Sequence, residues 1–489
     1  MIPAILAIDQ GTTNSKAVLV STSGRILARG SSPVGIEHPR PGWVEQNPLR
    51  VWASVQEAIA ACLGAVRGVD ILGIGISNQR ESVAAWDAQT GVPLGPVVSW
   101  QCRRTADACA ELAAAGHAER VQALTGLPID PMFPGPKMKW LLDRVPGDRD
   151  SRLGTIDAWL IHCLTGGAVH ACDASNAARS QLYDLSTQSW SDELCALFGV
   201  PKSALPEVHD SAARFGTTKG VSGLPDGIPI CSAIGDSHAA LFGHGAFHPG
   251  DGKVTFGTGS SVMATLPGFL PPQRGITTTI AWAIDGRPTY AFEGNILVSA
   301  AALPWMADML GLPDVQALTD LAATAEPGGP GFVPAFVGLG APHWQADARA
   351  LFSGITFGTT RAQMARAVTD SIAFQVHDVF AAMRGQSPTR LGQLYVDGGP
   401  SQNTFLMQCV ADIIDHQLIQ CDAPEASAMG AAYLAGLTLG IWPDLPAIAA
   451  LPRAEHLLSP NSTDSAGQLS IWRDAIYRAS LPKAKSEGE

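Results

Sequence analysis

The feature that most restricts the fold of this chain is a local pattern that occurs twice, once in each half. An apolar stretch runs into a turn of Gly, Thr and Ser and then into a second apolar stretch, at residues 4–20 and again at 253–266. Apolar stretches separated by such short turns are typical of antiparallel strands. The two turns, at 10–14 and 257–261, indicate one structural device used twice. We therefore expect an α/β fold of two duplicated domains with a cleft between them.

Other patterns mix strands and helices in both halves. Further strands are expected at 25–29, 71–76, 276–284 and 288–292, the last two joined at Asp285 and Gly286. Helices are expected at 51–66, 360–384, 405–414 and 426–439. A loop is expected at 326–334, and the residues after Pro482 are expected to fray. In the helix at 426–439, the small residues at 430–432 allow the close approach of another backbone or of a flat ligand.

Composition excludes several classes of protein. The chain has 489 residues, of which 46% are hydrophobic and 16% charged, so it is not a largely disordered protein. The formal net charge is -12, and basic residues do not cluster beyond Arg103 and Arg104, so we expect no nucleic-acid or membrane partner. No run of about 18 apolar residues and no secretory leader is found. The nine cysteines form no CxxC pair, which favours reduced thiols and a cytoplasmic location.

The first candidate for ligand binding is the turn after the first strand. Asp9 ends an apolar stretch and is followed by Gly11, Thr12, Thr13 and Lys16. Backbone N–H groups and hydroxyls that point into one concavity bind phosphate, and a single carboxylate can hold a magnesium ion that keeps several waters. The alternative is an ordinary hairpin in which Asp9 is a turn former.

Two further turns have a similar character. Residues 257–259 read Gly-Thr-Gly and could face the other side of a nucleotide, or could form an ordinary turn. Residues 397–399 read Asp-Gly-Gly between an apolar stretch and a helix, and Asn403 follows. Glycines at a strand–helix junction permit close contact with an anionic ligand, but Asn403 could equally face solvent beside a tight turn.

Charged residues at the ends of two strands form the next candidates. Arg80 and Glu81 follow the stretch at 71–76, where ligands of open α/β sheets bind, and they suit a polyhydroxylated ligand; a surface ion pair is the alternative. Asp236 enters a helical segment and could accept a hydroxyl proton during phosphoryl transfer, or could simply cap the helix. We assign His238 no role. Trp100 and Trp344 could be pocket walls or core residues, and from these residues alone we expect both to lie in the core.

The order of these elements along the chain resembles the FGGY carbohydrate kinase family, and within it most closely the glycerol kinases. The matching stretches run collinearly at 7–13, 41–45 (PGWVE), 78–81, 100–105 (WQCRRT), 235–236, 257–259, 338–342 and 396–399. Residues 133–143 and 351–375 are near matches to the two signatures of that family. The WQCRRT and PGWVE strings are the most specific of these.

The resemblance implies two actin- or ribonuclease-H-like domains, which we expect at 1–245 and 246–489. It implies transfer of the γ-phosphoryl group of ATP, with Mg²⁺, to a terminal hydroxyl of a small polyol or sugar. By position, Asp236 matches the catalytic base and Asp9 the carboxylate near the metal. The expected nucleotide-binding residues are Thr12, Thr13, Lys16, Gly257, Thr258, Gly259, Gly398, Gly399 and Asn403. The expected substrate-binding residues are Arg80, Glu81, Trp100, Met132, Asp236, Ser237 and Ser261. We also expect a homodimer.

Three departures concern the substrate. Glycerol kinases place Tyr, Gln and Phe where this chain has Met132, Ser237 and Ser261, and the Tyr and Phe rings wall a three-carbon substrate. Overall similarity favours glycerol, whereas a roomier, more polar pocket suits a four- or five-carbon polyol or ketose such as erythritol, threitol, erythrulose, ribulose or xylulose. Two alternatives come from other classes of protein: an actin-like ATPase without a metabolite substrate, and an inactive sugar-sensing module.

Overall fold

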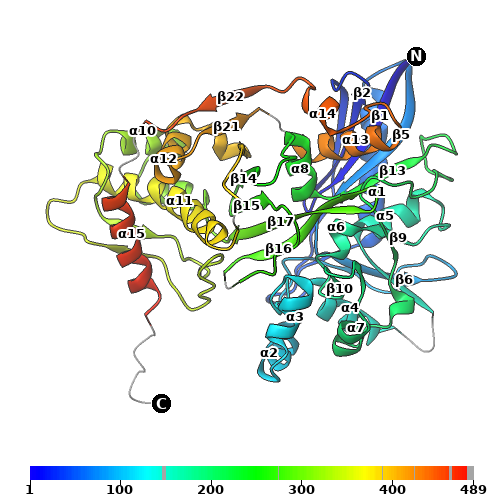
Figure 1. Cartoon of the computed structure of the whole chain (residues 1–489), viewed down its shortest axis with the longest axis horizontal. Coiled ribbons are helices and arrows are strands. Elements are labelled where there is room, and N and C mark those ends of the chain that lie inside the picture. Colours follow the sequence, from blue (N-terminus) through cyan, green and yellow to red (C-terminus); the bar gives the residue numbers. More distant parts are fainter. Residues whose placement is uncertain (146–149, 274, 388, 423–424, 462–464, 482–489) are drawn as a thin grey trace.

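The computed structural model describes residues 1–145, 150–273, 275–387, 389–422, 425–461 and 465–481. The expected frayed segment after Pro482 lies outside these residues. Two lobes, each built around a sheet, form the molecule (Figure 1). Within these ranges, every helix is too short or too polar to span a lipid bilayer.

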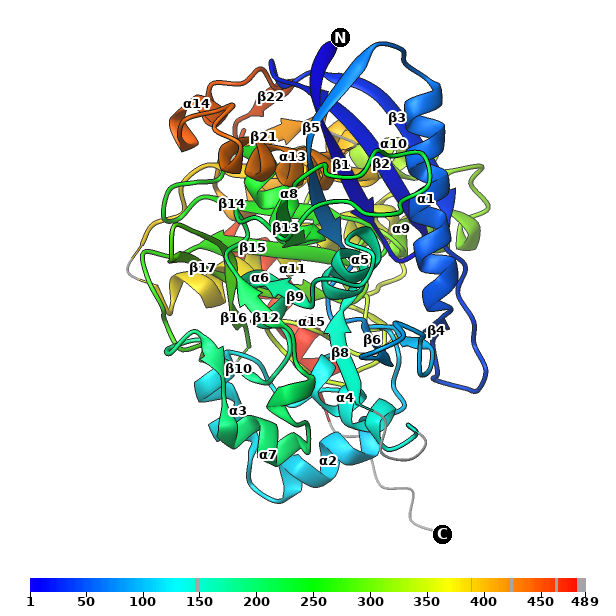
Figure 2. The same ribbon diagram turned by 90° about the vertical axis from the view of Figure 1, so that its right-hand side faces the viewer.

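The sheet of the first lobe has the order β13-β5-β1-β2-β3. Its strands are β1 (Ile2–Gln10), β2 (Asn14–Ser21), β3 (Ile26–Pro33), β5 (Val69–Asn78) and β13 (Ile230–Gly235). β1, β2 and β3 form the expected antiparallel meander, and β5 and β13 join β1 in parallel. Helix α1 (Pro48–Gly64), capped by Asn47, lies along β2 and β3 (Figure 2).

The sheet of the second lobe has the order β16-β17-β15-β14-β20-β21-β22. Its strands are β14 (Gly252–Phe256), β15 (Ser260–Thr265), β16 (Thr277–Ile284), β17 (Arg287–Ile296), β20 (Leu394–Asp397), β21 (Leu418–Cys421) and β22 (Glu455–Leu458). β14 pairs antiparallel with β15, and β15 with β17, while β20 and β21 continue in parallel. This is the pairing pattern of the first sheet, with β16 and β22 added at the edges, so the expected duplication is confirmed.

Helices α8 (Asp236–His244) and α13 (Ala426–Thr438) are equivalent in this duplication, because α8 follows β13 and α13 follows β21. They pack against each other between the two sheets (Figure 1). Gly430 permits this contact: a Cβ there would lie 1.8 Å from the carbonyl oxygen of Ala239. The small residues of α13 therefore serve the approach of a second helix backbone.

Other elements cover the sheets and extend the lobes. The other helices are α2 (Ala106–Ala114), α3 (Ala118–Thr125), α4 (Pro134–Leu142), α5 (Ile156–Leu164), α6 (Ala174–Ala177), α7 (Asp192–Phe198), α9 (Ala302–Met309), α10 (Val315–Ala323), α11 (Arg361–Arg384), α12 (Thr404–Ile414), α14 (Leu445–Ala449) and α15 (Ala466–Ala479), with 3₁₀ turns η1 (Lys202–Ala204) and η2 (Gly399–Gln402). The other strands are β4 (Glu45–Gln46), β6 (Val83–Asp87), β7 (Val97–Val98), β8 (Ser151–Thr155), β9 (Ala171–Asp173), β10 (Tyr183–Asp184), β11 (Ser189–Trp190), β12 (Glu207–His209), β18 (Gly331–Val333) and β19 (Leu351–Ser353).

Two predictions are wrong. The loop at 326–334 contains β18, which pairs with β19, because Phe332 and Val333 bury their side chains beneath α11 and α15. Trp344 is not a core residue: its side chain is 40% exposed, and its indole N–H donates to the carbonyl of Gly275 at 2.9 Å. Both misses involve tertiary partners that are distant in sequence.

Candidate active site

The candidate residues gather where the carboxyl ends of the parallel strands of both sheets meet. Asp9 lies at the end of β1, Arg80 follows β5, and Asp236 follows β13. The turns at 257–259 and 398–399 follow β14 and β20 of the second sheet in the same way. Ligands of α/β proteins usually bind at this edge of the sheet, because the loops that follow the strands carry side chains that can reach a ligand.

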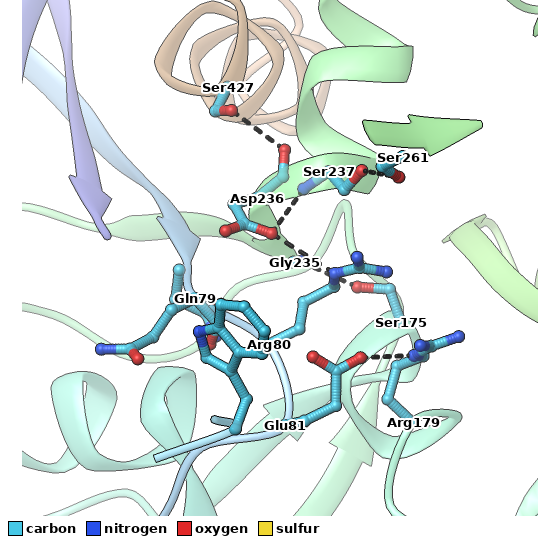
Figure 3. A network of polar contacts seen from close by, with 12 residues as sticks. Gln79, Arg80, Glu81, Ser175, Arg179, Gly235, Asp236, Ser237, Ser261 and Ser427 are labelled. Carbon is cyan, nitrogen blue, oxygen red and sulfur yellow. Dashed lines mark hydrogen bonds and ion pairs between the residues drawn. The ribbon is translucent and has the colours of Figure 1, made fainter. Parts of the chain in front are cut away.

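A buried chain of alternating charges crosses the site. Glu81 Oε1 accepts from Arg179 Nε at 2.6 Å, and Arg179 Nη1 lies 2.6 Å from Glu293 Oε2. Glu293 Oε1 accepts from Arg80 Nη2 at 2.8 Å, and Arg80 Nε lies 3.3 Å from Asp236 Oδ1. Figure 3 shows Arg80 beneath Asp236, and Glu81 beside Arg179. The surface-pair alternative for Arg80 and Glu81 is wrong, since both side chains are buried.

Sequence reasoning missed Arg179 and Glu293. Arg179 lies just after α6 in the first lobe, whereas Glu293 is a residue of β17 in the second. Glu293 is the only charged residue of β17 after Arg287, within a stretch of buried side chains, and a lone carboxylate in such a strand was a usable signal. Arg179 offers no comparable pattern, because its partners are reached only through the tertiary fold.

Asp236 combines a charged partner with access to solvent. Gly235, not Asp236, is the N-cap of α8, so the simple capping interpretation is wrong. The Asp236 carboxylate accepts the N–H of Ser237 at 2.6 Å, and its main-chain oxygen accepts from Ser427 Oγ on α13 at 3.0 Å. Its side chain is 38% exposed. Removal from bulk water raises the pKa of Asp236, and the positive charge of Arg80 opposes this rise.

Asp9 is the expected carboxylate near the metal and phosphates. It pairs with Lys16 in the β1–β2 ladder, so it is a strand residue and not a turn former. Its Oδ1 accepts from Ser77 Oγ at 2.8 Å. Burial raises the pKa of Asp9 to about 6, and the charges of Asp236 and Glu425 add to the rise.

A cation fits this position, because it would favour the ionised form of Asp9. Within the described ranges, no three His, Cys, Asp or Glu side chains gather at a possible metal site. Magnesium suits such a site, since it is bound through one or two carboxylates, water and substrate phosphates.

Lys16 joins the two halves of the site. Its Nζ lies 3.0 Å from Glu425 Oε2 at the start of α13. Its neighbours Thr12 and Thr13 lie in the turn, and Thr12 Oγ1 accepts from the indole N–H of Trp100 at 2.9 Å. Trp100 is 36% exposed, so it is not a core residue, and its part in substrate binding stays a prediction. These contacts bring the expected nucleotide and substrate sides within one hydrogen bond of each other.

The glycine turns differ in what their glycines contact. Gly398 has a φ of 91°, and a Cβ there would lie 2.0 Å from the carbonyl oxygen of Phe256, so it brings two backbones together. Gly259 likewise faces the carbonyl of Ile296, at 2.4 Å from a Cβ. Gly257 and Gly399 have more room, and Gly399 is exposed with nothing within 4 Å of a Cβ. Thr258 is exposed beside them.

The side chain of Asn403 forms hydrogen bonds within the protein. Its side-chain oxygen accepts the N–H of Leu406 and caps α12, and its amide donates to Thr319 Oγ1 at 2.9 Å. The solvent-facing alternative is therefore wrong. A part in nucleotide binding stays a prediction for this residue.

Two of the three departures from the glycerol kinase pattern, Ser237 and Ser261, lie next to each other beside Asp236. Ser237 Oγ of the first lobe lies 3.2 Å from Ser261 Oγ of the second (Figure 3). Ser261 Oγ is also 3.4 Å from Glu293 Oε1. Two hydroxyls thus lie close to the charged groups of Arg80, Glu293 and Asp236, and hydroxyl-bearing ligands are the chemistry that such a set recognises.

The buried amino group of Lys137 holds the segments that carry three of the expected substrate residues. Lys137 Nζ donates to the carbonyls of Glu81 at 2.7 Å, Ser99 at 3.3 Å and Met132 at 2.6 Å. Ser99 immediately precedes Trp100, so one side chain ties together the segments that carry Glu81, Trp100 and Met132.

Residues of the WQCRRT and PGWVE strings fix the segment that carries Trp100. Arg104 of WQCRRT lies between the rings of Trp43 and Trp140, 4.0 Å and 4.3 Å from their centroids. Its Nη2 is also 2.7 Å from Glu45 Oε1 of PGWVE. Cation–π contacts and an ion pair therefore hold the segment that carries Trp100 against the lobe.

Comparison with known proteins gives one consistent result. Residues 4–243 match the N-terminal domain, and residues 252–439 the C-terminal domain, of the FGGY family of carbohydrate kinases. The chain is 45% identical to an apulose kinase of Pectobacterium atrosepticum, over 98% of this chain and 99% of that protein. It is 44% identical to a glycerol kinase of Symbiobacterium thermophilum, over 97% and 98%. The crystal structure of Plasmodium falciparum glycerol kinase with ADP superposes with a TM-score of 0.93 at 30% identity, covering 98% of this chain and 99% of that one.

Proposed function

We infer that this chain, which belongs to the FGGY family of carbohydrate kinases, transfers the γ-phosphoryl group of ATP to a terminal hydroxyl of a four- or five-carbon ketose or polyol. Membership of this family makes the chain a sugar or polyol kinase, which leaves the actin-like ATPase and the inactive sensor without support. Family membership does not identify the acceptor substrate, so we infer it from the residues of the site. The homodimer and the domain boundary at residue 245 stay predictions.

Asp236 is the group that we propose as the base. Its carboxylate takes the proton of the acceptor hydroxyl as that oxygen bonds to the γ-phosphorus, and the bond from phosphorus to the bridging oxygen breaks to release ADP. Arg80 and Glu81 bind the other hydroxyls, and Trp100 covers them. Asp9 would hold Mg²⁺, which neutralises charge on the phosphates when bound. The turns at 11–13, 257–259 and 398–399 supply backbone N–H groups to the nucleotide.

The pair Ser237 and Ser261 is the observation that carries the choice of acceptor. Two small hydroxyl-bearing side chains, 3.2 Å apart, stand where glycerol kinases are expected to place Gln and Phe. The smaller side chains leave room for one or two further carbons, and their hydroxyls can bond a carbonyl or hydroxyl that glycerol lacks. Apulose, a branched five-carbon ketose, is one molecule of this description, and the Pectobacterium relative bears its name.

Glycerol is the second candidate. Several relatives are named glycerol kinases, and one of them is 44% identical to this chain, against 45% for the apulose kinase. A difference of one per cent does not separate two substrates, so overall identity favours neither.

The test is ADP release by the purified protein with ATP and Mg²⁺, first without an acceptor and then with each of several. The panel is glycerol, erythritol, threitol, erythrulose, ribitol, ribulose, xylulose and apulose. We expect the highest kcat/KM with a four- or five-carbon ketose or polyol. A highest kcat/KM with glycerol would contradict this proposal and make Ser237 and Ser261 a repacked glycerol pocket.

A further inference from the structure

We propose that Glu293 is a positioning residue of the second lobe that holds Arg80 away from full pairing with Asp236, so that one oxygen of Asp236 stays open to the acceptor hydroxyl. The proposal rests on the proposed function in one respect, since it takes Asp236 as the base. It adds a residue that does not face the acceptor directly, because Glu293 is 1% exposed.

The geometry of Arg80 carries this inference. Its Nη2 is bonded to Glu293 at 2.8 Å, whereas its ion pair with Asp236, from Nε at 3.3 Å, lacks the geometry of a hydrogen bond. Arginine prefers to meet a carboxylate through two parallel hydrogen bonds, and Arg80 does not do so with Asp236. Across the described residues, the hydrogen bond that the Asp236 carboxylate accepts comes from Ser237 N, to Oδ1. Oδ2 is therefore the oxygen that can take a proton.

Glu293 is held in turn by a second arginine. Its other oxygen lies 2.6 Å from Arg179 Nη1, and Arg179 is itself fixed by Glu81. Arg80, Arg179 and Glu81 belong to the first lobe and Glu293 to the second. The position of Arg80 against Asp236 therefore depends on a contact between the two lobes.

The Glu293→Gln variant should fold, because it leaves the buried network with balanced charges. The network contains two guanidinium groups and three carboxylates, so Glu293→Gln leaves two of each and no excess buried charge. The other charged groups that face Asp236 are Lys253 and Asp9, and both remain. His238 is buried beside both arginines, and burial lowers the pKa of this imidazole well below its usual value, so it stays neutral.

In the variant, Arg80 is free to pair with Asp236 through two nitrogens. That pairing stabilises the carboxylate, which becomes a weaker base with a lower pKa. We expect kcat to fall by roughly 10²-fold, the lower range of what a positioned base contributes, with the KM for ATP nearly unchanged. The acid limb of the kcat/KM profile should move to lower pH. Glu293→Asp keeps the charge, so its acid limb should stay near that of the wild type.

The experiment compares wild type, Glu293→Gln, Glu293→Asp and a control, Asp370→Asn. Asp370 is a buried carboxylate in an ion pair with Arg366 on α11, so this control removes equivalent charge elsewhere. Kinetics use the best acceptor of the panel across pH. An unmoved acid limb in Glu293→Gln, or an equal shift in Asp370→Asn, would overturn the proposal.

A crystal structure of Glu293→Gln tests the position of Arg80 without any acceptor substrate. Bidentate Arg80 on Asp236 supports the proposal, and an unchanged Arg80 overturns it. If the wild type phosphorylates no member of the panel, the proposed function fails, while this structural result still decides the role of Glu293.

Discussion

Gly430 of α13 lies so close to Ala239 of α8 that a Cβ on the glycine would be 1.8 Å from the alanine carbonyl oxygen. This contact brings the two equivalent helices of the duplicated fold together. Asp236 begins one of these helices, and Ser427 of the other donates to its main-chain oxygen. The position of the proposed base is thus set by a helix contact that only glycine allows.

Gly430→Ala should destabilise the protein and reduce activity. The added methyl forces α8 and α13 apart, and overpacking of this kind costs roughly 1–3 kcal/mol. Urea denaturation should show a lower midpoint. Gly467→Ala on α15 is the matched control, since nothing lies within 4 Å of a Cβ there. Equal stability of Gly430→Ala and the control would show that the two helices can separate without cost.

Asp236→Asn should keep nucleotide binding and lose most phosphoryl transfer. The amide cannot accept the proton of the acceptor, and a positioned base contributes about 10²–10⁴-fold in rate. Calorimetric titration with ATP and the rate of ADP release measure the two properties separately. Turnover close to that of the wild type would remove Asp236 from the role of base.

Asp9 should make the stability of the protein depend on pH. Its pKa is raised from 3.8 to about 6 in the folded state, so the folded state binds more protons than the unfolded chain between these values. The free energy of unfolding therefore falls as the pH rises through this window, and stays at the lower level above it. Asp9→Asn should remove this dependence and raise Tm at pH 7.5. Mg²⁺ should raise the Tm of the wild type more than that of the variant.

Asp378→Asn is the control, because the folded state lowers the pKa of Asp378 whereas it raises the pKa of Asp9. His343, His377 and Trp472 donate to this carboxylate and hold its pKa down to about 2. Its stabilising contribution is present above its ordinary pKa and is lost as the pH falls toward 2, so this variant should lower Tm at pH 7.5. If Asp9→Asn also lowered Tm at that pH, the account of Asp9 would be wrong.

Ser261→Phe should shift substrate preference toward glycerol. The ring fills the space beside Ser237 and removes a hydroxyl, and a lost hydrogen bond to a substrate hydroxyl changes discrimination strongly. The measurement is the ratio of kcat/KM for the best four- or five-carbon acceptor to that for glycerol. Ser260→Ala, whose hydroxyl bonds to Ser299 and not to the site, provides the comparison. An unchanged ranking would contradict the pocket argument.

Lys137→Met should raise the KM for the acceptor by about tenfold, with the KM for ATP unchanged, because leaving buried carbonyls without a donor costs about 1–3 kcal/mol. The variant frees the carbonyls of Glu81 and Met132, and these segments carry expected acceptor contacts. Lys139→Met on the outer face of the same helix is the control. Parallel increases in both KM values would indicate general loosening of the lobe instead.

Much of the fold could be predicted because its signals are local. Strand alternation, the hairpin at Asp285 and Gly286, and the long helix at 360–384 each follow from patterns within about twenty residues. The structure confirms all three, with φ values of 51° and 71° at the hairpin turn. The short strand β18 was missed because it is defined by its pairing with β19 and not by its own residues.

The sequence by itself determined the duplicated architecture, the family and the identity of the charged residues at the strand ends, because these depend on residue type and order along the chain. Only the tertiary structure decided which groups meet. Glu293 lies 213 residues from Arg80, and Ser261 lies 24 residues from Ser237, yet each pair is within 3.5 Å. Side-chain contacts between lobes depend on the packing of whole sheets and helices, and no local pattern in either segment records the partner that the other will supply.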